Sequence, residues 1–560
     1  MKALRYLYAI AAGSAMSLSM QAQTQPQDST LNRTVVVEQE YNPDIMNAVK
    51  VNVLPEVPPV TVSKKPVNYA TSLLPADEVP SPLLAPRAGK EKEIPALPGY
   101  ARLGYGNRGN LDLYANYLFT LSDKARLNAM LSLDGMDGKL ERPGDEEWDS
   151  HYYRTRAALD YTYALSRMDL RAGARFGLSN FNLLPITFDS KQKFTSGSIS
   201  LGVDSRDKTL PLQFSAETNL MLYQRQADFQ LGINDRETRI DTRAHLFAPL
   251  DDRQDVGVEL RMNNFFFTQE EHPQNDYFSE SFDGNRMENY TVLNLNPYYR
   301  YRSEAWDVRL GLHIDPTFGL GKKLQVAPDV TARYTLENGS QLYAGLTGGR
   351  RENDFRQLEV INPYARLSDQ LDATYEQLNA TLGYRLGSGG FWMNLYGGYQ
   401  SLKNDLTSYY EPWTGGEYRI TVDWSQGDTE NLFAGLDLAY NYKEVLKFSL
   451  SALYRSWSDK DGEGMNIQFK PTLTLDLRAD VRPMEPLLLS VGYHHVEREK
   501  QLGLEENEPV SNLYLQASYE LFRHIAIYLR AGNLLNRNYQ LYAGYPAQGI
   551  NFLGGVTFRF

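Results

Sequence analysis

Alternation of apolar and polar positions dominates the chain from Tyr100 to its last residue. Over residues 446–455, 473–480 and 513–521 every second residue is apolar, and those between are mostly polar or charged. A two-residue period predicts β-strands with one face in an apolar medium and the other in water. Residues 550–560 repeat the pattern, with apolar residues or glycine at every even position. We therefore expect an all-β protein that ends on a closing strand.

Connections between these stretches come in two sizes that alternate along the chain. The short ones are 122–124, 166–167, 251–253, 303–304, 337–340, 387–390, 443–444, 482–485 and 523–524. The long ones are 136–151, 226–235, 270–287, 352–373, 403–428, 457–464, 498–509 and 533–548. Short turns at one rim and long loops at the other are typical of outer-membrane barrels. The sequence thus predicts a transmembrane antiparallel β-barrel of about 22 strands over residues 100–560, with both ends at the short-turn rim.

Composition supports a barrel rather than a bundle of membrane helices. The mean hydropathy is -0.47, and only the N-terminus approaches a helix-length apolar run. The 38 tyrosines suit a membrane interface, where the ring lies in the apolar band and the hydroxyl stays wet. The net charge of -12, with no basic stripe, argues against nucleic acid as a partner. The chain has no cysteine, which removes disulfides, thiolate metal sites and cysteine nucleophiles.

The first hundred residues differ from the rest. Residues 1–22 have a basic start at Lys2 and Arg5, an apolar run and a small residue, Ala22, which predicts a cleaved signal peptide. Residues 23–99 hold eleven prolines between positions 43 and 98. Proline removes the backbone donors that sheets and helices need. We therefore expect an extended, proline-rich periplasmic segment there.

The C-terminal tail carries a family resemblance. Gly532-Asn533-Leu534-Leu535-Asn536-Arg537, the Gly544-Tyr545-Pro546 turn and the terminal Phe560 closely resemble the last two strands and final loop of TonB-dependent receptors. That family consists of 22-stranded outer-membrane barrels that import scarce nutrients. Ile550 departs from the pattern, since the family usually has Arg there. The resemblance also implies that Phe558 and Phe560 form a signal for the barrel-assembly machinery.

The N-terminal side departs further from that family. TonB-dependent receptors fill the barrel with an ordered plug domain, whereas residues 23–99 contain no plug-like sequence. Thr34-Val35-Val36-Val37 is similar to a TonB box, which pairs as a strand with the energising protein TonB. The alternative is that these four residues add as a strand to another partner's edge. We expect a receptor-type barrel without its plug, in the outer membrane of a Gram-negative bacterium.

Several groups of residues are candidates for binding sites. His495 and Glu497 would share a strand face while His494 points away, and a metal site needs a further ligand. The acidic run at 145–149 lacks the ligand spacing of a calcium loop. Aromatic residues in the long loops could stack on a flat ligand, lie in the outer interfacial girdle or cap the loops; they are Trp148, Tyr409, Tyr410 and Trp413. We expect no cofactor, no catalytic residues and no enzymatic activity.

Two functions follow. The first is uptake of a nutrient across the outer membrane, with outer-membrane lipid, the assembly machinery and TonB or another periplasmic protein as partners. The alternative is a non-transporting barrel subunit of a surface or assembly complex, docking partners through residues 23–99. A barrel of about 22 strands encloses more space than side chains fill. We expect loops 352–373 and 403–428 to fold inward, with part of 23–99 at the periplasmic mouth.

Overall fold

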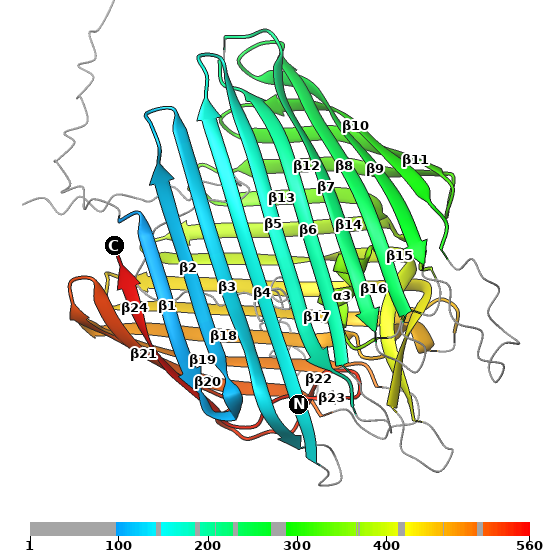
Figure 1. The fold of residues 1–560 in the computed structure, drawn as a ribbon. Coiled ribbons are helices and arrows are strands. Elements are labelled where there is room, and N and C mark those ends of the chain that lie inside the picture. Colours follow the sequence, from blue (N-terminus) through cyan, green and yellow to red (C-terminus); the bar gives the residue numbers. More distant parts are fainter. Residues whose placement is uncertain are drawn as a thin grey trace, which may run out of the picture. The chain divides into compact units, whose positions relative to one another are not determined.

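The computed structural model describes most of the chain after residue 96 (Figure 1). The ranges it describes are 97–141, 147–184, 191–207, 209–227, 233–269, 287–365, 367, 370–412, 420–462, 464–500 and 508–560. The predicted signal peptide, the proline-rich segment up to residue 96 and the Thr34-Val35-Val36-Val37 segment lie outside the described residues. No described helix is both long and apolar enough to cross a membrane.

Strands make up most of the described chain. The first half of the barrel consists of β1 (Gly99–Gly106), β2 (Leu111–Thr120), β3 (Ala125–Glu141), β4 (Glu147–Ala164), β5 (Met168–Asn182), β6 (Lys191–Ser205), β7 (Gln213–Ala227), β8 (Ile233–Pro249), β9 (Gln254–Gln269), β10 (Tyr290–Arg302) and β11 (Trp306–Phe318). The second half consists of β12 (Leu324–Thr335), β13 (Gln341–Arg351), β14 (Thr374–Ser388), β15 (Phe391–Pro412), β16 (Ile420–Tyr442), β17 (Leu446–Asp459), β18 (Pro471–Met484), β19 (Leu487–Arg498), β20 (Val510–Phe522), β21 (Ile525–Gly532) and β24 (Asn551–Arg559). The connections contain η1 (Asn107–Gly109), α3 (Phe355–Ile361), η2 (Met465–Ile467), β22 (Gln540–Tyr542) and β23 (Tyr545–Pro546).

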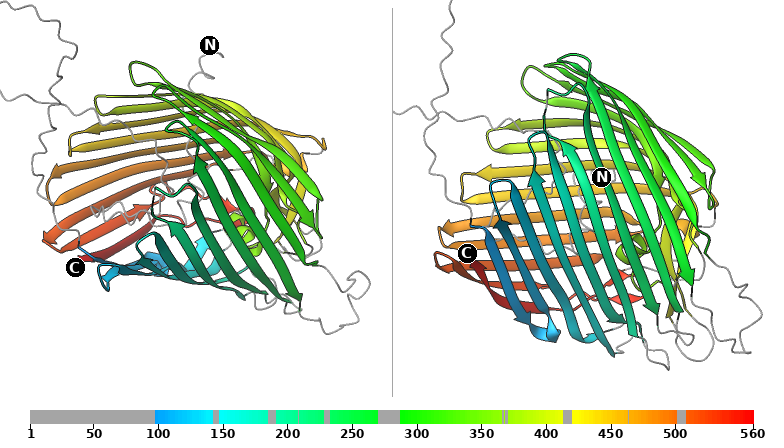
Figure 2. Two further views of the ribbon diagram at one scale, coloured as in Figure 1. Left: turned by 90° about the horizontal axis from the view of Figure 1, so that it is seen from above. Right: turned by 45° about the horizontal axis from the view of Figure 1, so that its top comes forward.

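The strands form one closed antiparallel sheet. Each strand pairs with the next along the chain, and the 22-stranded sheet closes where β1 pairs with β24 (Figures 1 and 2). Tyr100 lies opposite Arg559 at this closure, and the Gly99 N–H donates to the Phe560 carbonyl at 2.7 Å. The predicted all-β antiparallel barrel of about 22 strands is therefore confirmed, with its two ends at the same rim.

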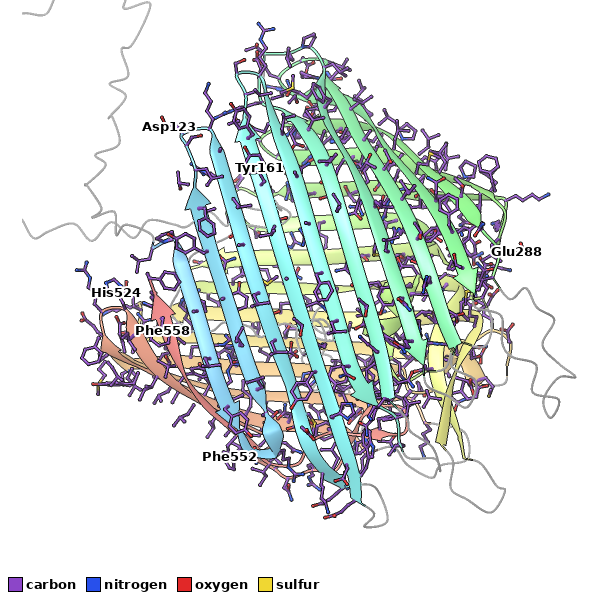
Figure 3. The ribbon with its side chains drawn as sticks, in the orientation of Figure 1. Asp123, Tyr161, Glu288, His524, Phe552 and Phe558 are labelled. Atoms are coloured by element: carbon purple, nitrogen blue, oxygen red, sulfur yellow. The ribbon has the colours of Figure 1, made fainter. Side chains whose placement is uncertain are left out.

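The two faces of the wall have opposite chemistry (Figure 3). On β24, Phe552 and Phe558 point away from the barrel and are 52% and 41% exposed. Thr557, between Val556 and Phe558 on the same strand, is 2% exposed and points to the lumen. Successive side chains of a strand point to opposite faces, so the alternation read from the sequence becomes an apolar outer wall and a polar lumen.

Glycine permits close packing at the seam between the first and last strands. Gly104 lies opposite Gly555, and a Cβ on Gly555 would lie 2.6 Å both from the Gly104 Cα and from the Tyr528 ring. The Tyr528 hydroxyl donates to Asp112 Oδ2 at 2.9 Å, and Arg102 donates to Asp112 Oδ1 at 2.8 Å. Arg102 is only 1% exposed. The buried Arg102–Asp112 ion pair, bonded to Tyr528, therefore lies at the seam beside the backbone pairing of β1 with β24.

The rims mostly match the predicted turns, with three corrections. The predicted loop 136–151 is largely strand, since β3 runs to Glu141 and β4 begins at Glu147. The predicted loop 403–428 is likewise mostly a hairpin of β15 and β16. In these extensions the alternation continues, but its apolar face is turned inward to the buried cluster, as for Met136, Leu140 and Val422, which is the reverse of the wall. The turn predicted at 482–485 is shifted, because β18 runs to Met484.

Candidate functional site

Charged side chains line the lumen in pairs that span neighbouring strands. Arg154 on β4 contacts Asp134 on β3 at 2.6 Å. Arg309 on β11 lies 2.8 Å from Asp329 on β12 and 2.9 Å from Glu259 on β9. Further pairs that join neighbouring strands are Arg171–Asp204, Arg300–Asp307 and Arg333–Asp307, whereas Arg478 pairs with Asp480 within β18. These lumen charges are thus paired, as expected of charges that lie away from bulk water.

The connection after β13 places a short helix inside the ring of strands (Figure 2). Asp354 caps α3, accepting the Gln357 backbone N–H at 2.8 Å. Phe355 and Leu358 lie three residues apart and are 3% and 1% exposed, so they share the buried face of the helix. Glu359 follows on that same face. The segment 352–365, which contains α3, is called the inner segment below.

One carboxylate attaches the inner segment to three strands of the wall. Arg156 on β4 donates to Glu359 Oε1 at 3.0 Å, and Ser179 on β5 donates to the same oxygen. The Tyr223 hydroxyl on β7 donates to Glu359 Oε2. On β7, Leu222 points outward and is 55% exposed, so the neighbouring Tyr223 faces the lumen. The helix is therefore bound to the lumen face of the wall.

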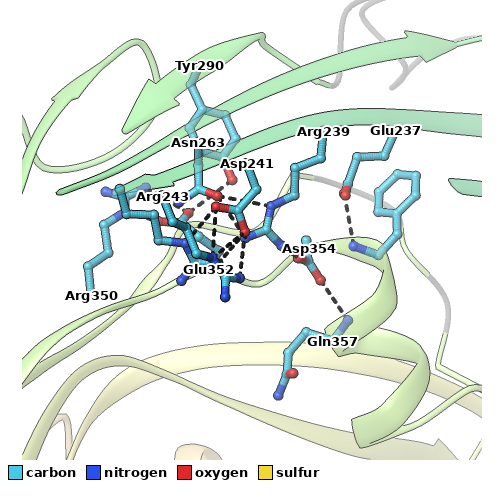
Figure 4. Close-up of polar contacts among 12 residues, drawn as sticks. Glu237, Arg239, Asp241, Arg243, Asn263, Tyr290, Arg350, Glu352, Asp354 and Gln357 are labelled. Atoms are coloured by element: carbon cyan, nitrogen blue, oxygen red, sulfur yellow. Dashed lines mark hydrogen bonds and ion pairs between the residues drawn. The ribbon is translucent and has the colours of Figure 1, made fainter. Parts of the chain in front are cut away.

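A second set of polar contacts holds the start of the helix (Figure 4). Arg239 on β8 pairs with Asp354, and the Phe355 backbone N–H donates to Glu237 at 2.9 Å. Arg239 also donates to Asn263 on β9 at 2.8 Å. Next to Arg239, the Asp241 carboxylate accepts hydrogen bonds from Arg243 and Arg261 at 2.7 and 2.8 Å. Arg350 lies 2.6 Å from Glu352.

An apolar cluster joins the inner segment to loops from distant parts of the chain. The Tyr364 ring stacks on the Tyr545 ring, with centroids 3.9 Å apart and an interplanar angle of 12°. Trp148 of β4 meets Tyr545 edge-on at 5.5 Å and is 2% exposed. Burial raises the pKa of the Tyr364 hydroxyl well above its usual value. The loop between β21 and β24, which carries the family resemblance, is thus part of this apolar cluster, and the cluster is called the closure below.

The β15–β16 hairpin covers the inner segment from the other side. Its register shifts between Leu402 and Asp405, and Asn404 has a positive φ of 50°. A bulge of this kind re-aims the side chains beyond it. Asn362 then donates to the Ser408 hydroxyl at 3.0 Å. The predicted inward folding of loop 352–373 is confirmed for its described residues, and the predicted loop 403–428 contributes as a hairpin.

The structure places the predicted sites as follows. Phe558 and Phe560 point outward, and the Phe560 ring stacks on Tyr117 at a centroid distance of 5.7 Å. Trp148 on β4 is buried against Tyr364 and Tyr545. Tyr409 is partly exposed, whereas the Tyr410 side chain and Trp413 lie outside the described residues.

The candidate metal ligands do not converge. His495 lies 3.6 Å from Glu497, whereas His494 faces the lumen and contacts Asp476 at 2.9 Å. Among the described residues, no group of three or more His, Asp or Glu side chains could hold a metal ion. In the acidic run, Glu147 pairs with Lys139 at 2.6 Å, and Asp145 and Glu146 lie outside the described residues.

Sequence reasoning missed α3 and its carboxylates. The sequence does contain a short signal for the start of a helix. Asp354 precedes Phe355, and an apolar residue follows three positions later at Leu358. A seven-residue helix falls below the length at which periodicity separates helix from loop. Its inward position is set by pairing with residues more than a hundred positions away, which no local pattern contains.

Comparison with solved structures finds barrels of the same fold. The FrpB iron transporter from Neisseria meningitidis, in its apoprotein form, matches with a TM-score of 0.65 at 10% identity, over 82% of this chain and 81% of that chain. The copper transporter OprC matches with a TM-score of 0.62 at 12% identity, over 82% of each chain. The ferric enterobactin receptor PfeA matches with a TM-score of 0.63 at 13% identity, over 82% of this chain and 81% of that chain.

The fold is that of TonB-dependent receptors. The match covers the barrel and confirms the resemblance drawn from the C-terminal tail. No protein-family model and no curated protein matches the chain by sequence. At these identities the likeness concerns the fold.

Proposed function

We propose that the protein is an outer-membrane barrel of a Gram-negative bacterium that takes part in nutrient uptake. The observation that carries this proposal is the combination of an apolar outer wall, a paired-charge lumen and an outer mouth covered by interlocked loops. An apolar wall buries itself in lipid, and a hydrated lumen offers a route to a polar solute. A barrel of this strand number has room for more than its own side chains.

The solutes named for the similar structures guide the choice of substrate. Those proteins are described as copper and iron transporters and as a receptor for ferric enterobactin. We propose a nutrient too large for ordinary porins, and metal complexes are the first class to test. Thr34-Val35-Val36-Val37 would pair as a strand with TonB, supplying energy from the inner membrane.

Uptake by living cells tests this proposal. A strain lacking the protein, and the same strain complemented with it, would be given labelled ferric siderophores, copper complexes and oligosaccharides. We expect accumulation of at least one label to fall without the protein and to return with it. Deleting residues 34–37 should abolish that uptake while leaving the barrel in the membrane. Equal accumulation of every label in both strains would argue against uptake.

A second function rests on the closure itself. The buried aromatic cluster, with Phe181 at 0% and Trp148 at 2% exposure, would also suit a barrel that stays shut and serves as a membrane anchor for a complex. Affinity purification from native outer membranes separates the two functions. A stoichiometric periplasmic partner that is lost on deleting residues 23–96, with uptake unchanged, would favour the anchor.

A further inference from the structure

The inner segment is attached to the wall by contacts that can be broken without unfolding the barrel. Every strand of the wall is already paired on both sides, so none of the ladder hydrogen bonds depends on α3. The attachment instead consists of side-chain contacts to Glu359 and Asp354, one backbone N–H donated to Glu237, the Ala365 carbonyl that accepts from Arg225 at 3.0 Å, and the packed side chains of Phe355, Leu358 and Tyr364. Release of this segment would therefore leave the sheet closed.

The ends of the inner segment are joined to strands of irregular geometry. Near the end of β13, Gly349 has a φ of +141°, a conformation that side-chain-bearing residues rarely adopt. At the start of β14, the register shifts between Glu376 and Leu378 in the pairing with β15. A bulge and a left-handed glycine are places where backbone angles can change with little effect on the neighbouring strands.

Glu359 makes three of the polar contacts that attach the inner segment to the wall. Glu359 has a side-chain exposure of 10% and receives donors from three different strands. Hydrogen bonds to a charged group are the strong ones, and their loss leaves buried donors to be solvated. Replacing Glu359 therefore removes three of the contacts that hold the inner segment on the wall and should shift the balance toward the released position.

We propose that the inner segment is a gate across the lumen, held shut by Glu359. In the shut position α3 lies against β4, β5 and β7, and the β15–β16 hairpin covers it through Asn362 and Ser408. In the open position the helix leaves the wall, and Arg156, Ser179 and Tyr223 become solvated lumen residues. The inference rests on the proposed function, because a gate has meaning only where solutes pass.

Ionic current through the purified full-length protein in planar lipid bilayers tests the gate. Wild-type protein in potassium chloride should show rare, brief openings. Glu359→Ala should raise the ratio of open to closed time about tenfold or more, the factor expected when one charge-assisted hydrogen bond is lost. Glu359→Gln, which keeps the size and one acceptor, should fall between the two and serves if the alanine variant fails to fold.

A matched control and a covalent lock make the test decisive. Glu217→Gln removes a lumen-facing carboxylate on β7 that pairs with the wall residue Arg171 at 3.2 Å, and should leave the current unchanged. The chain has no cysteine, so Asn362→Cys combined with Ser408→Cys introduces two thiols at positions whose wild-type side chains hydrogen-bond at 3.0 Å, and oxidation can be tested for a disulfide between them. Added to Glu359→Ala, the oxidised pair should restore the shut state, and dithiothreitol should reopen it.

Two outcomes would overturn the gate. One is a Glu359→Ala current equal to that of wild type in protein that remains a heat-modifiable barrel. The other is a disulfide that forms and leaves the Glu359→Ala current unchanged. Because the current is carried by potassium and chloride, without nutrient or TonB, a working gate with no cellular uptake would count against the proposed function alone.

Discussion

At the scale of single residues, the seam between β1 and β24 depends on one buried carboxylate. Asp112 accepts from Arg102, Tyr528 and Arg530, and its side chain is only 8% exposed. A buried pair contributes little net free energy when intact, but removing one partner leaves an uncompensated charge. The closing strands should therefore be sensitive to substitutions that their outer, apolar face would tolerate.

Asp112→Ala should destabilise the barrel by about 3–5 kcal/mol, the usual cost of breaking a buried ion pair. The measurement is the midpoint of urea unfolding of the refolded barrel in lipid vesicles. Asp123→Ala, in the exposed turn between β2 and β3, is the matched control and should shift the midpoint little. Equal midpoints for the two variants would show that the seam is not held by Asp112.

Tyr539 reports on the closure through its ionisation. It is packed with Val496 and Val510, and burial raises the pKa of its hydroxyl from 10 to about 12. The folded state favours the neutral hydroxyl, so this contribution to stability is complete below about pH 10 and is lost as the pH rises through about 12. Titration by tyrosinate absorbance should show a step near pH 12 that Tyr539→Phe lacks. If the step that Tyr539→Phe loses lies near pH 10 and not near pH 12, the buried position of Tyr539 is wrong.

At the scale of elements, the strand wall and the inward folding of loop 352–373 could be predicted from the sequence, whereas the helix α3 and its contacts could not. Strands such as β17 carry the two-residue period because one face meets an apolar medium and the other meets water. The β15–β16 extension was predicted as a loop although Val422 and Trp424 alternate with Asp423 and Ser425, because its apolar side packs on the inner cluster and not on the outer face. The helix α3 is fixed by contacts between Glu359 and strands 136 to 203 residues away in sequence.

A further prediction concerns the role of the last strand in assembly of the barrel. Removing Phe560 should lower the amount of heat-modifiable barrel in the membrane while export continues, as the family resemblance implies. The deletion also removes two backbone hydrogen bonds to Gly99, at 2.7 and 3.0 Å. Phe560→Ala keeps the backbone and removes only the ring, including its stacking on Tyr117. Normal barrel levels in both variants would show that the terminal aromatic is dispensable.

Orientation in the membrane is a prediction about the two rims. An epitope inserted between Pro412 and Ile420 should bind antibody on intact cells, since it extends the hairpin at the long-loop rim. Epitopes at Gly389 or Glu444, in turns of the opposite rim, should bind only after the outer membrane is permeabilised. The same cells stained with and without permeabilisation provide the comparison. The reverse pattern would place the long loops in the periplasm.

At the scale of the whole molecule, three features act together. The outer wall is apolar, the lumen is lined by paired charges, and residues from β4, the inner segment and the final loop meet in one cluster. The wall explains why a chain with a mean hydropathy of -0.47 can be a membrane protein. Under the proposed function, the lumen would be the route of a polar solute and the inner segment would be its gate.

The central claim is that the lumen face meets water while the opposite face meets lipid, and one labelling measurement tests it directly. Ser449 and Leu450 are neighbours on β17, with Ser449 on the lumen face and Leu450 on the outer face. Each would be replaced by cysteine in the cysteine-free chain, reconstituted into liposomes and treated with a charged maleimide. Ser449→Cys should be labelled at least about tenfold faster than Leu450→Cys, as strand alternation across a barrel wall requires. Equal rates, or faster labelling of Leu450→Cys, would contradict a membrane-embedded barrel with a hydrated lumen.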